Sequence, residues 1–244
     1  MTLSGLSPSA MSSHFFTERK RIFTMRIRHA IFDMDGLLFD SERVYEQGYI
    51  TLAPKYGLVP NHELFLKTVG TAYEKSKEAF LEVYKDLDYD AMREELRKYM
   101  KHAMESALIP LKPGVHNILS ALKNNGVTIS LATSTRRQLA MFMLKTGDID
   151  NYFDESVCGD EVTMAKPDPE IFFKAMNLLG GTPEDTVIFE DSHNGIRAAN
   201  AACIPVIMVP DLLPPVPELT TFAVAEDLNA ALKFILPMIG ENAK

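Results

Sequence analysis

The chain has 244 residues, enough for one large α/β domain or for a core domain with a smaller insert. Its 46% hydrophobic and 24% charged residues are typical of a folded globular protein and exclude wholesale disorder. The net charge of −8 argues against a nucleic-acid partner, because such proteins neutralise phosphates with a basic surface.

The first 24 residues are predicted to be a disordered extension, because they are rich in Ser and lack any apolar periodicity. No apolar run in the chain approaches the roughly 18 residues that cross a bilayer, so we expect no membrane partner. Cys158 and Cys203 lie far apart in apolar surroundings and match no metal-binding spacing. We expect two buried, reduced thiols and therefore a cytoplasmic protein.

The chain then alternates between two kinds of pattern. A strand is expected at 29–32, where a short apolar run leads into acidic residues and Gly36. From 41 to 108 the apolar residues recur at helical spacing, and Pro and Gly divide the segment into about four helices. After Pro113 and Gly114, helices are expected at 115–124, 137–144, 169–179 and 195–202. Strands are expected at 127–132, 155–158, 186–189, 205–209 and 222–225.

Strands that alternate with helices indicate a parallel sheet covered on both faces. The predicted fold is therefore α/β, with a doubly wound, Rossmann-like parallel core formed by residues 25–40 and 109–244. An all-helical domain, residues 41–108, is inserted into this core.

Polar side chains follow three of the predicted strands, at the edge of the sheet where ligands bind in this architecture. These residues are Asp33 and Asp35 after the first strand, Thr133, Ser134 and Thr135 after the second, and Glu190 and Asp191 after a later one. Lys166 lies in a loop just before a helix. Together they supply the carboxylates, hydroxyls and cation that phosphoryl transfer needs.

Several carboxylates in one place require a cation, and hard oxygen ligands beside a phosphate favour Mg²⁺. The candidate metal ligands are Asp33, Asp35, Glu190 and Asp191. Asp33 is the predicted nucleophile, which forms a phospho-aspartate, and Asp35 is the predicted general acid and base. The candidate phosphate-binding residues are Thr133, Ser134 and Lys166.

Each assignment has a structural alternative. The Asp-x-Asp pair could form a turn and cap a helix, and the three hydroxyl residues 133–135 could cap the next helix. Glu190 could reach the metal only through water or through another side chain. Ser192 is expected only to cap the helix that follows it.

The sequence resembles the haloacid dehalogenase superfamily in four motifs that occur in order. Asp33–Ser41 (DMDGLLFDS) matches its nucleophile motif, Thr133 the second motif, Lys166 the third, and 190–195 (EDSHNG) the fourth. The resemblance covers roughly residues 26–236. The helical insert is similar to the cap type called C1, which implies a small phosphorylated metabolite as the partner.

Within this superfamily the chain is similar to the β-phosphoglucomutase-like branch, and especially to pseudouridine-5′-phosphatase-like members. Mutases of that branch carry a histidine where this chain has Tyr45, and a Gly-x-Ser-Arg turn where it has 69–73 (VGTAY). The resemblance therefore implies a Mg²⁺-dependent phosphatase that hydrolyses a sugar phosphate or a nucleoside 5′-monophosphate such as pseudouridine 5′-phosphate. A phosphosugar mutase is the alternative.

Positions in the insert suggest substrate contacts from Glu42, Tyr45 and Thr71, because a cap closes over the core. A monomer is expected. A non-catalytic phospho-switch resembling a response-regulator receiver is a further alternative. The helical insert and a nucleophile at the first strand argue against it.

Overall fold

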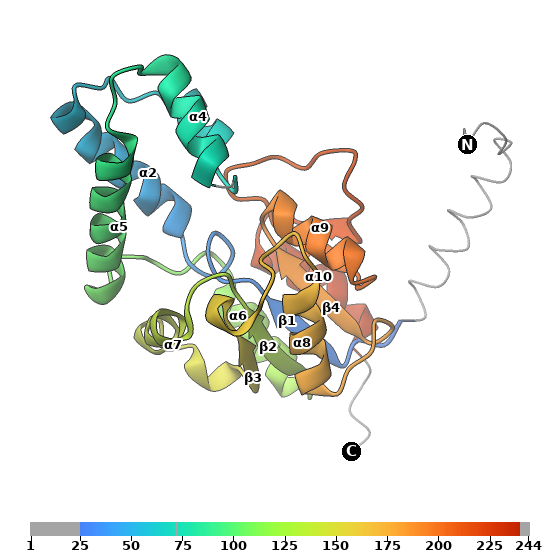
Figure 1. Cartoon of the computed structure of the whole chain (residues 1–244). Coiled ribbons are helices and arrows are strands. Elements are labelled where there is room, and N and C mark those ends of the chain that lie inside the picture. The colour runs from blue at the N-terminus through green and yellow to red at the C-terminus, as the bar shows by residue number, and fades with distance from the viewer. Residues whose placement is uncertain (1–24, 72, 240–244) are drawn as a thin grey trace, which may run out of the picture.

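A computed structural model describes residues 25–71 and 73–239 of the chain (Figure 1). The predicted disordered extension, 1–24, lies outside the described residues, as does Ala72 of the turn at 69–73. No helix in the described part of the chain is long and apolar enough to cross a membrane.

Six strands form one sheet in the order β3-β2-β1-β4-β5-β6, and every neighbouring pair is parallel. The strands are β1 (His29–Phe32), β2 (Thr128–Ala132), β3 (Glu155–Val157), β4 (Thr186–Glu190), β5 (Val206–Met208) and β6 (Ala223–Val224). In the centre, Phe32 of β1 lies opposite Leu131 of β2 and Phe189 of β4. This confirms the predicted doubly wound parallel sheet.

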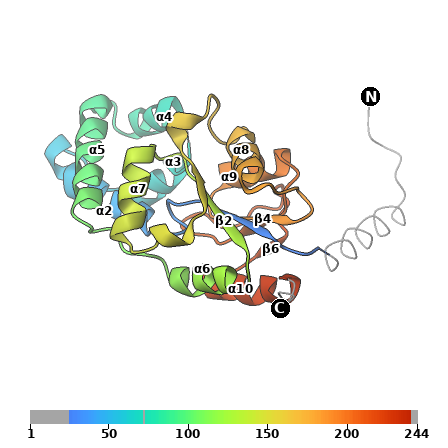
Figure 2. The same cartoon turned by 90° about the horizontal axis from the view of Figure 1, so that it is seen from below.

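Helices cover both faces of the sheet (Figure 2). One face packs against α6 (Val115–Asn124), α7 (Arg137–Thr146) and α10 (Leu228–Ile235), and the other against α8 (Glu170–Leu179) and α9 (His193–Ala201). Successive β1 side chains point to opposite faces, so Ala30 and Phe32 belong to one apolar cluster and Ile31 to the other. Burial on both faces explains why the strands read as continuous apolar runs.

Residues 41–108 form a helical segment beside the sheet (Figure 1). Its α-helices are α2 (Ser41–Leu52), α3 (His62–Thr68), α4 (Tyr73–Val83) and α5 (Tyr89–Glu105), in agreement with the expected number. The segment has an apolar cluster of its own, in which Tyr49 stacks on Phe65 at 5.8 Å and meets the edge of Phe80 at 5.5 Å. Aromatic packing of this kind stabilises a small core.

The chain crosses between the sheet and the helical segment twice, and the two crossings are paired. The Asp40 amide donates to the Pro110 carbonyl (2.9 Å), and the Lys112 amide donates to the Leu38 carbonyl (2.8 Å). A cluster of ion pairs surrounds this point, and we call Asp40, Arg43, Lys112 and Asp211 the hinge cluster. The Asp211 side chain is 1% exposed and binds both Arg43 and Lys112.

The two cysteines differ in burial. Cys158 is buried, and this burial raises the pKa of its thiol to about 11. Cys203 is exposed in the turn after α9, where its φ is +57°. The expectation of two buried thiols is therefore wrong for Cys203, because the turn directs its apolar neighbours Ala202 and Ile204 inward instead.

Candidate active site

The candidate site lies where the strand order reverses. From β1 the chain proceeds to β2 on one side and reaches β4 on the other, and ligands bind beyond the carboxyl ends of strands at such a point. Asp33 follows β1 directly, and Thr133 follows β2. Glu190 is the last residue of β4, and Asp191 follows it. The sheet therefore brings Asp33 and Asp191 together, although they are about 160 positions apart in sequence.

Lys166 is the centre of this arrangement. Its Nζ donates to Asp33 Oδ1 (2.5 Å), to Glu190 Oε1 (2.7 Å) and to the Ala132 carbonyl (3.0 Å), which uses all three ammonium donors. The side chain is only 6% exposed and lies over the Phe172 ring. Burial lowers the pKa of Lys166, but the two carboxylates outweigh burial and hold this pKa above its usual value. Lys166 is therefore a fixed cation.

Glu190 is fully buried and has both carboxylate oxygens occupied. Its Oε1 binds Lys166, and its Oε2 accepts from the Ser192 amide (2.8 Å) and hydroxyl (3.0 Å). A Cβ at Gly195 would lie 1.7 Å from Oε1, so only glycine fits there. Ser192 also caps α9, as predicted, by accepting from the Gly195 amide. Of the alternatives for Glu190, this geometry favours a role through another side chain, Lys166.

Asp33 and Asp35 are carboxylates in an unfavourable environment. The pKa of Asp33 is raised to about 7, because burial and the charges of Glu190 and Asp35 outweigh the opposing charge and hydrogen bond of Lys166. Burial also raises the pKa of Asp35, although the hydroxyl of Thr135 favours its ionised form. Thr135 Oγ1 donates to Asp35 Oδ2 at 2.7 Å. Asp35 is thus held in place and can carry a proton more readily than an exposed aspartate.

The Asp191 carboxylate is buried beside the other site carboxylates. Its Oδ1 is buried and has no hydrogen-bond partner in the described part of the chain. A Cβ at Gly36, whose φ is +80°, would lie 2.3 Å from Asp191 Oδ2, so the carboxylate rests against the bare backbone of the first loop. Burial and the charges of Glu190 and Asp33 raise the pKa of Asp191 well above its usual value. A buried, unpaired carboxylate beside two others fits a cation.

The side chains of the site fit Mg²⁺, which takes much of its coordination from water and phosphate, better than a metal whose ligands are all protein side chains. Within 25–71 and 73–239, no three His, Cys, Asp or Glu side chains converge closely enough to hold a metal by themselves. Mg²⁺ is usually bound through one or two carboxylates, with waters and substrate phosphate completing its coordination. Asp33 and Asp191, with Asp35 beside them, fit that requirement, whereas Thr135 binds one oxygen of Asp35 and the oxygens of Glu190 are already engaged.

The hydroxyl residues after β2 separate into different roles. Thr133 is fully buried, and its Oγ1 accepts from the Thr135 amide (3.0 Å). Ser134 is exposed at the turn, with its backbone close against Gly159. Thr135, one of the three hydroxyl residues expected after this strand, contacts Asp35, although no role in the site was predicted for it individually. Its place in a run of three hydroxyls after a strand was the available signal.

The candidates in the helical segment, Glu42, Tyr45 and Thr71, form no hydrogen bond or ion pair with Asp33 among the described residues, although Glu42 follows Ser41, whose hydroxyl accepts from the Gly36 amide of the first loop. The Thr71 hydroxyl donates to the Thr68 carbonyl (2.8 Å) and also contacts Ser76, so it is engaged within the segment. The neighbouring Gly70 carbonyl accepts from Asn194 of the core (2.6 Å). Tyr45 accepts a hydrogen bond from Arg93 of α5, which was not among the predicted site residues.

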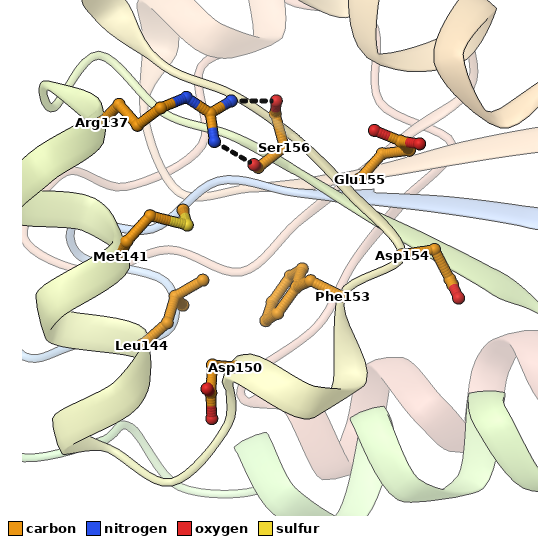
Figure 3. A pocket seen from close by; sticks show the side chains of 8 residues that line it. All are labelled: Arg137, Met141, Leu144, Asp150, Phe153, Asp154, Glu155 and Ser156. Carbon is orange, nitrogen blue, oxygen red and sulfur yellow. Dashed lines mark hydrogen bonds between the residues drawn. The ribbon is translucent and has the colours of Figure 1, made fainter.

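A separate cavity of about 180 Å³ lies between α7 and the edge strand β3 (Figure 3). Arg137 projects across it and donates to the Ser156 hydroxyl (3.0 Å) and carbonyl (2.7 Å). This contact occupies the exposed edge of β3. None of the predicted site residues lines the cavity, so it is distinct from the candidate site.

Comparisons with known proteins agree with this geometry. Residues 30–209 match the family described as "Haloacid dehalogenase-like hydrolase". The "Phosphorylated carbohydrates phosphatase" of Thermotoga maritima is 34% identical over 180 residues, which cover 71% of this chain and 81% of that protein. The "Probable pseudouridine-5'-phosphatase" of Drosophila melanogaster is 34% identical over 195 residues, covering 76% and 83% of the two chains.

A solved structure extends the similarity to the whole architecture. The crystal structure of a "putative beta-phosphoglucomutase" from Thermotoga maritima superposes with a TM-score of 0.70 at 32% identity. The match covers 86% of this chain and 100% of that one, so the helical segment is included in the shared architecture.

Proposed function

The chain belongs to the haloacid dehalogenase-like hydrolase family and is a phosphoric monoester hydrolase, and we propose that it hydrolyses a small phosphorylated metabolite through a phospho-aspartate on Asp33. The observation that carries this proposal is the Lys166 ammonium, which joins Asp33 to Glu190 beside the unpaired Asp191. The proposed substrates are sugar phosphates and nucleoside 5′-monophosphates such as pseudouridine 5′-phosphate. Two relatives named for phosphorylated carbohydrates and pseudouridine-5′-phosphate support that class.

In the first step, Asp33 attacks the phosphorus atom. Lys166 engages Oδ1, which leaves Oδ2 of Asp33 to form the new O–P bond. The bond between phosphorus and the leaving oxygen breaks, and Asp35 donates its proton to that oxygen. The raised pKa of Asp35 favours the protonated form that this step requires.

In the second step, Asp35 takes a proton from water. The water oxygen attacks phosphorus, the bond to Asp33 breaks, and inorganic phosphate leaves. Thr135 holds the carboxylate of Asp35 through both steps, since its hydroxyl donates to Oδ2. The Thr133 side chain and the exposed Ser134 are proposed to contact the phosphoryl oxygens.

Charge is balanced by Lys166 and a divalent cation. Lys166 would stabilise the negative charge that develops on the phosphoryl oxygens, and Glu190 and Ala132 hold it at the position where that charge appears. Asp33 and Asp191, with Asp35 beside them, would hold Mg²⁺, which would supply electrostatic screening between carboxylate and phosphate.

The helical segment, residues 41–108, is proposed to act as a cap that closes over this site. Gly70 touches Asn194 of the core, and Leu212 of the core packs into the apolar cluster of the segment. These contacts support closure over a small molecule rather than over a polymer.

Phosphosugar mutation is the second candidate, because one structural relative is named for that activity. Tyr45 stands where mutases carry a histidine, and its hydroxyl is bound by Arg93. Incubation with a hexose 1-phosphate separates the two reactions. Free sugar and inorganic phosphate are expected for the phosphatase, whereas hexose 6-phosphate would contradict it.

The proposed function is tested by phosphate release from a panel of sugar phosphates and nucleoside 5′-monophosphates. We expect release to require Mg²⁺, to stop with chelator, and to be lost in Asp33→Asn. Acid quench of the wild type during turnover should trap a labelled phosphoryl group on Asp33. Full turnover in chelator, or in Asp33→Asn, would contradict the proposal.

A further inference from the structure

The first turn of α2 faces the site with two polar side chains. Glu42 and Tyr45 are three positions apart, so they lie on the same face of the helix. This turn directly follows the loop that carries Asp33 and Asp35, and both side chains are half-buried. Tyr45 packs against the core cluster and against the cluster of the helical segment, which places this face at their junction.

Arg93 reaches the same face from α5. Its guanidinium donates to the Tyr45 hydroxyl and lies 5.6 Å from the centre of the Tyr45 ring. This hydrogen bond uses one of the five guanidinium donors, and the ring holds the plane of the group in place. Arg93 is thus a half-buried, oriented cation at the junction of core and cap, with donors left for a ligand.

Glu42 provides an acceptor on the same face as this donor. The pKa of Glu42 is raised to about 7, because burial and the charges of Asp35 and Asp211 outweigh the opposing charge of Arg93. Glu42 follows Ser41, whose hydroxyl accepts from the Gly36 amide of the catalytic loop (3.1 Å), so Glu42 lies in the first turn of α2, beside that loop. A guanidinium donor and a carboxyl acceptor on these two helices complement hydroxyl groups, because each hydroxyl both donates and accepts.

The surrounding charges disfavour a second anion on the substrate. Asp35, Asp191 and Asp211 all act electrostatically on Glu42 or are acted on by it. Arg43 and Lys112 are already paired with Asp211. A carboxylate or second phosphate on the leaving group would therefore lie near several carboxylates, with only the Arg93 guanidinium to offset them. Removing such an anion from water would carry a high desolvation cost.

We propose that Arg93, together with Glu42, determines specificity by binding hydroxyl groups of an uncharged, polyhydroxylated leaving group. Arg93 is the residue that donates to these hydroxyls, and Tyr45 positions its guanidinium. The inference rests on the proposed phosphatase function and names the residues that select its substrates, phosphate monoesters whose leaving group is a neutral polyol such as a sugar or the ribose of a nucleoside.

The test compares three phosphate monoesters on the full chain with Mg²⁺. A hexose 6-phosphate has a neutral polyol leaving group, p-nitrophenyl phosphate has no hydroxyl besides the reacting oxygen, and phosphoglycolate has a carboxylate. The wild type should prefer the hexose phosphate to phosphoglycolate. Arg93→Gln should lower the ratio of kcat/KM for the hexose phosphate to that for p-nitrophenyl phosphate by about 10- to 100-fold, mainly through KM.

Three further variants make the result specific. Arg97→Gln changes an exposed arginine one turn along the same helix, paired with Glu94, and should leave the ratio unchanged. Arg93→Lys keeps the charge without the planar fork and should restore only part of the ratio. Glu42→Gln prevents this position from carrying a negative charge and should raise turnover of phosphoglycolate relative to the hexose phosphate.

The outcomes separate this inference from the function on which it rests. Absence of Mg²⁺-dependent turnover of p-nitrophenyl phosphate by the wild type would overturn both. Turnover with an unchanged ratio in Arg93→Gln would overturn the inference alone. The inference alone would also be overturned if the wild type preferred phosphoglycolate and Arg93→Gln abolished this preference, since Arg93 would then bind an anion. Thermal melts of each variant show whether a loss comes from unfolding instead.

Discussion

The charged groups at the end of the sheet and those on the helical cap differ in how fully they are bound. Beside the sheet, Lys166 uses all three donors and both oxygens of Glu190 are occupied. On the cap, Arg93 makes one hydrogen bond to Tyr45 and keeps other donors. Charged groups whose hydrogen bonds are all made within the protein are held in one position, which suits a single fixed reaction. A side chain with unused hydrogen-bond donors suits the recognition of a ligand.

Asp33→Asn should have the largest effect, because it removes the nucleophile and leaves Lys166 paired only with Glu190. We expect kcat to fall by about 10⁴-fold or more, measured as phosphate release under saturating substrate and Mg²⁺. Asp150→Asn changes an aspartate beside the separate cavity and serves as the control. A loss below about tenfold in Asp33→Asn would mean that another group attacks phosphorus.

Glu190→Gln should affect both catalysis and stability. The substitution removes the charge that balances Lys166 in a fully buried position, and breaking such a pair costs about 3–5 kcal/mol of unfolding free energy. Denaturant titration measures this loss, and Glu184→Gln, at an exposed position, is the control. We also expect kcat to fall by about 10²-fold, since Lys166 is less well placed. Equal stability in both variants would contradict the interpretation of Glu190 as the residue that holds Lys166.

Mg²⁺ should stabilise the protein in a pH-dependent manner. In chelator, Asp33 has a pKa raised from 3.8 to about 7 on folding, so the folded state binds the proton more tightly and the free energy of unfolding falls as pH rises across this window. Mg²⁺ needs the ionised carboxylates, so its stabilisation should be larger near pH 8 than near pH 5.

Thermal melts measure this effect. We expect Tm to rise by about 5 °C near pH 8 at a Mg²⁺ concentration about 100 times Kd. The increase should disappear in Asp191→Asn, whose unpaired Oδ1 is proposed to face the cation. An increase that is independent of pH and of Asp191 would place the cation elsewhere.

Two variants, one on the cap and one on the core residue that contacts it, should show the smallest effects and sharpen the contrast. Thr71→Val removes a hydroxyl that is engaged within the cap, so KM should change by less than about threefold. Asn194→Ala removes the core donor to Gly70 and should raise KM by about 3- to 10-fold. Steady-state kinetics on one sugar phosphate compares them. A larger effect for Thr71→Val would mean that its hydroxyl contacts the substrate.

The sequence predicts the part of the site that follows strand ends. Asp33, Thr133 and Asp191 each follow an apolar run, and parallel topology brings such positions together whatever lies between them. Lys166 is found by its loop and its motif. The doubly wound sheet follows from the same alternation of strands and helices.

The remaining contacts depend on tertiary packing that no local pattern encodes. Thr135 contacts Asp35 only because β1 and β2 are neighbours, and Arg93 meets Tyr45 only because α2 and α5 pack together. Arg93 reads as one of many charges on the exposed face of a helix. The sequence predicted no helix at the position of α10. This helix is short, and it is stabilised by the Asp227 side chain, which accepts from the Ala230 amide, and by packing against α6.

The hinge cluster concentrates the attachment of the helical segment at one place on the core. Asp40 and Lys112 lie on the two crossings, and Asp211 lies on the loop after β5, so one buried carboxylate ties the crossings to the core at neighbouring points. We propose that the two crossings act as one pivot for the proposed cap. A tilt at this pivot would be amplified toward the far end of the segment and would set how wide the entrance for substrate opens.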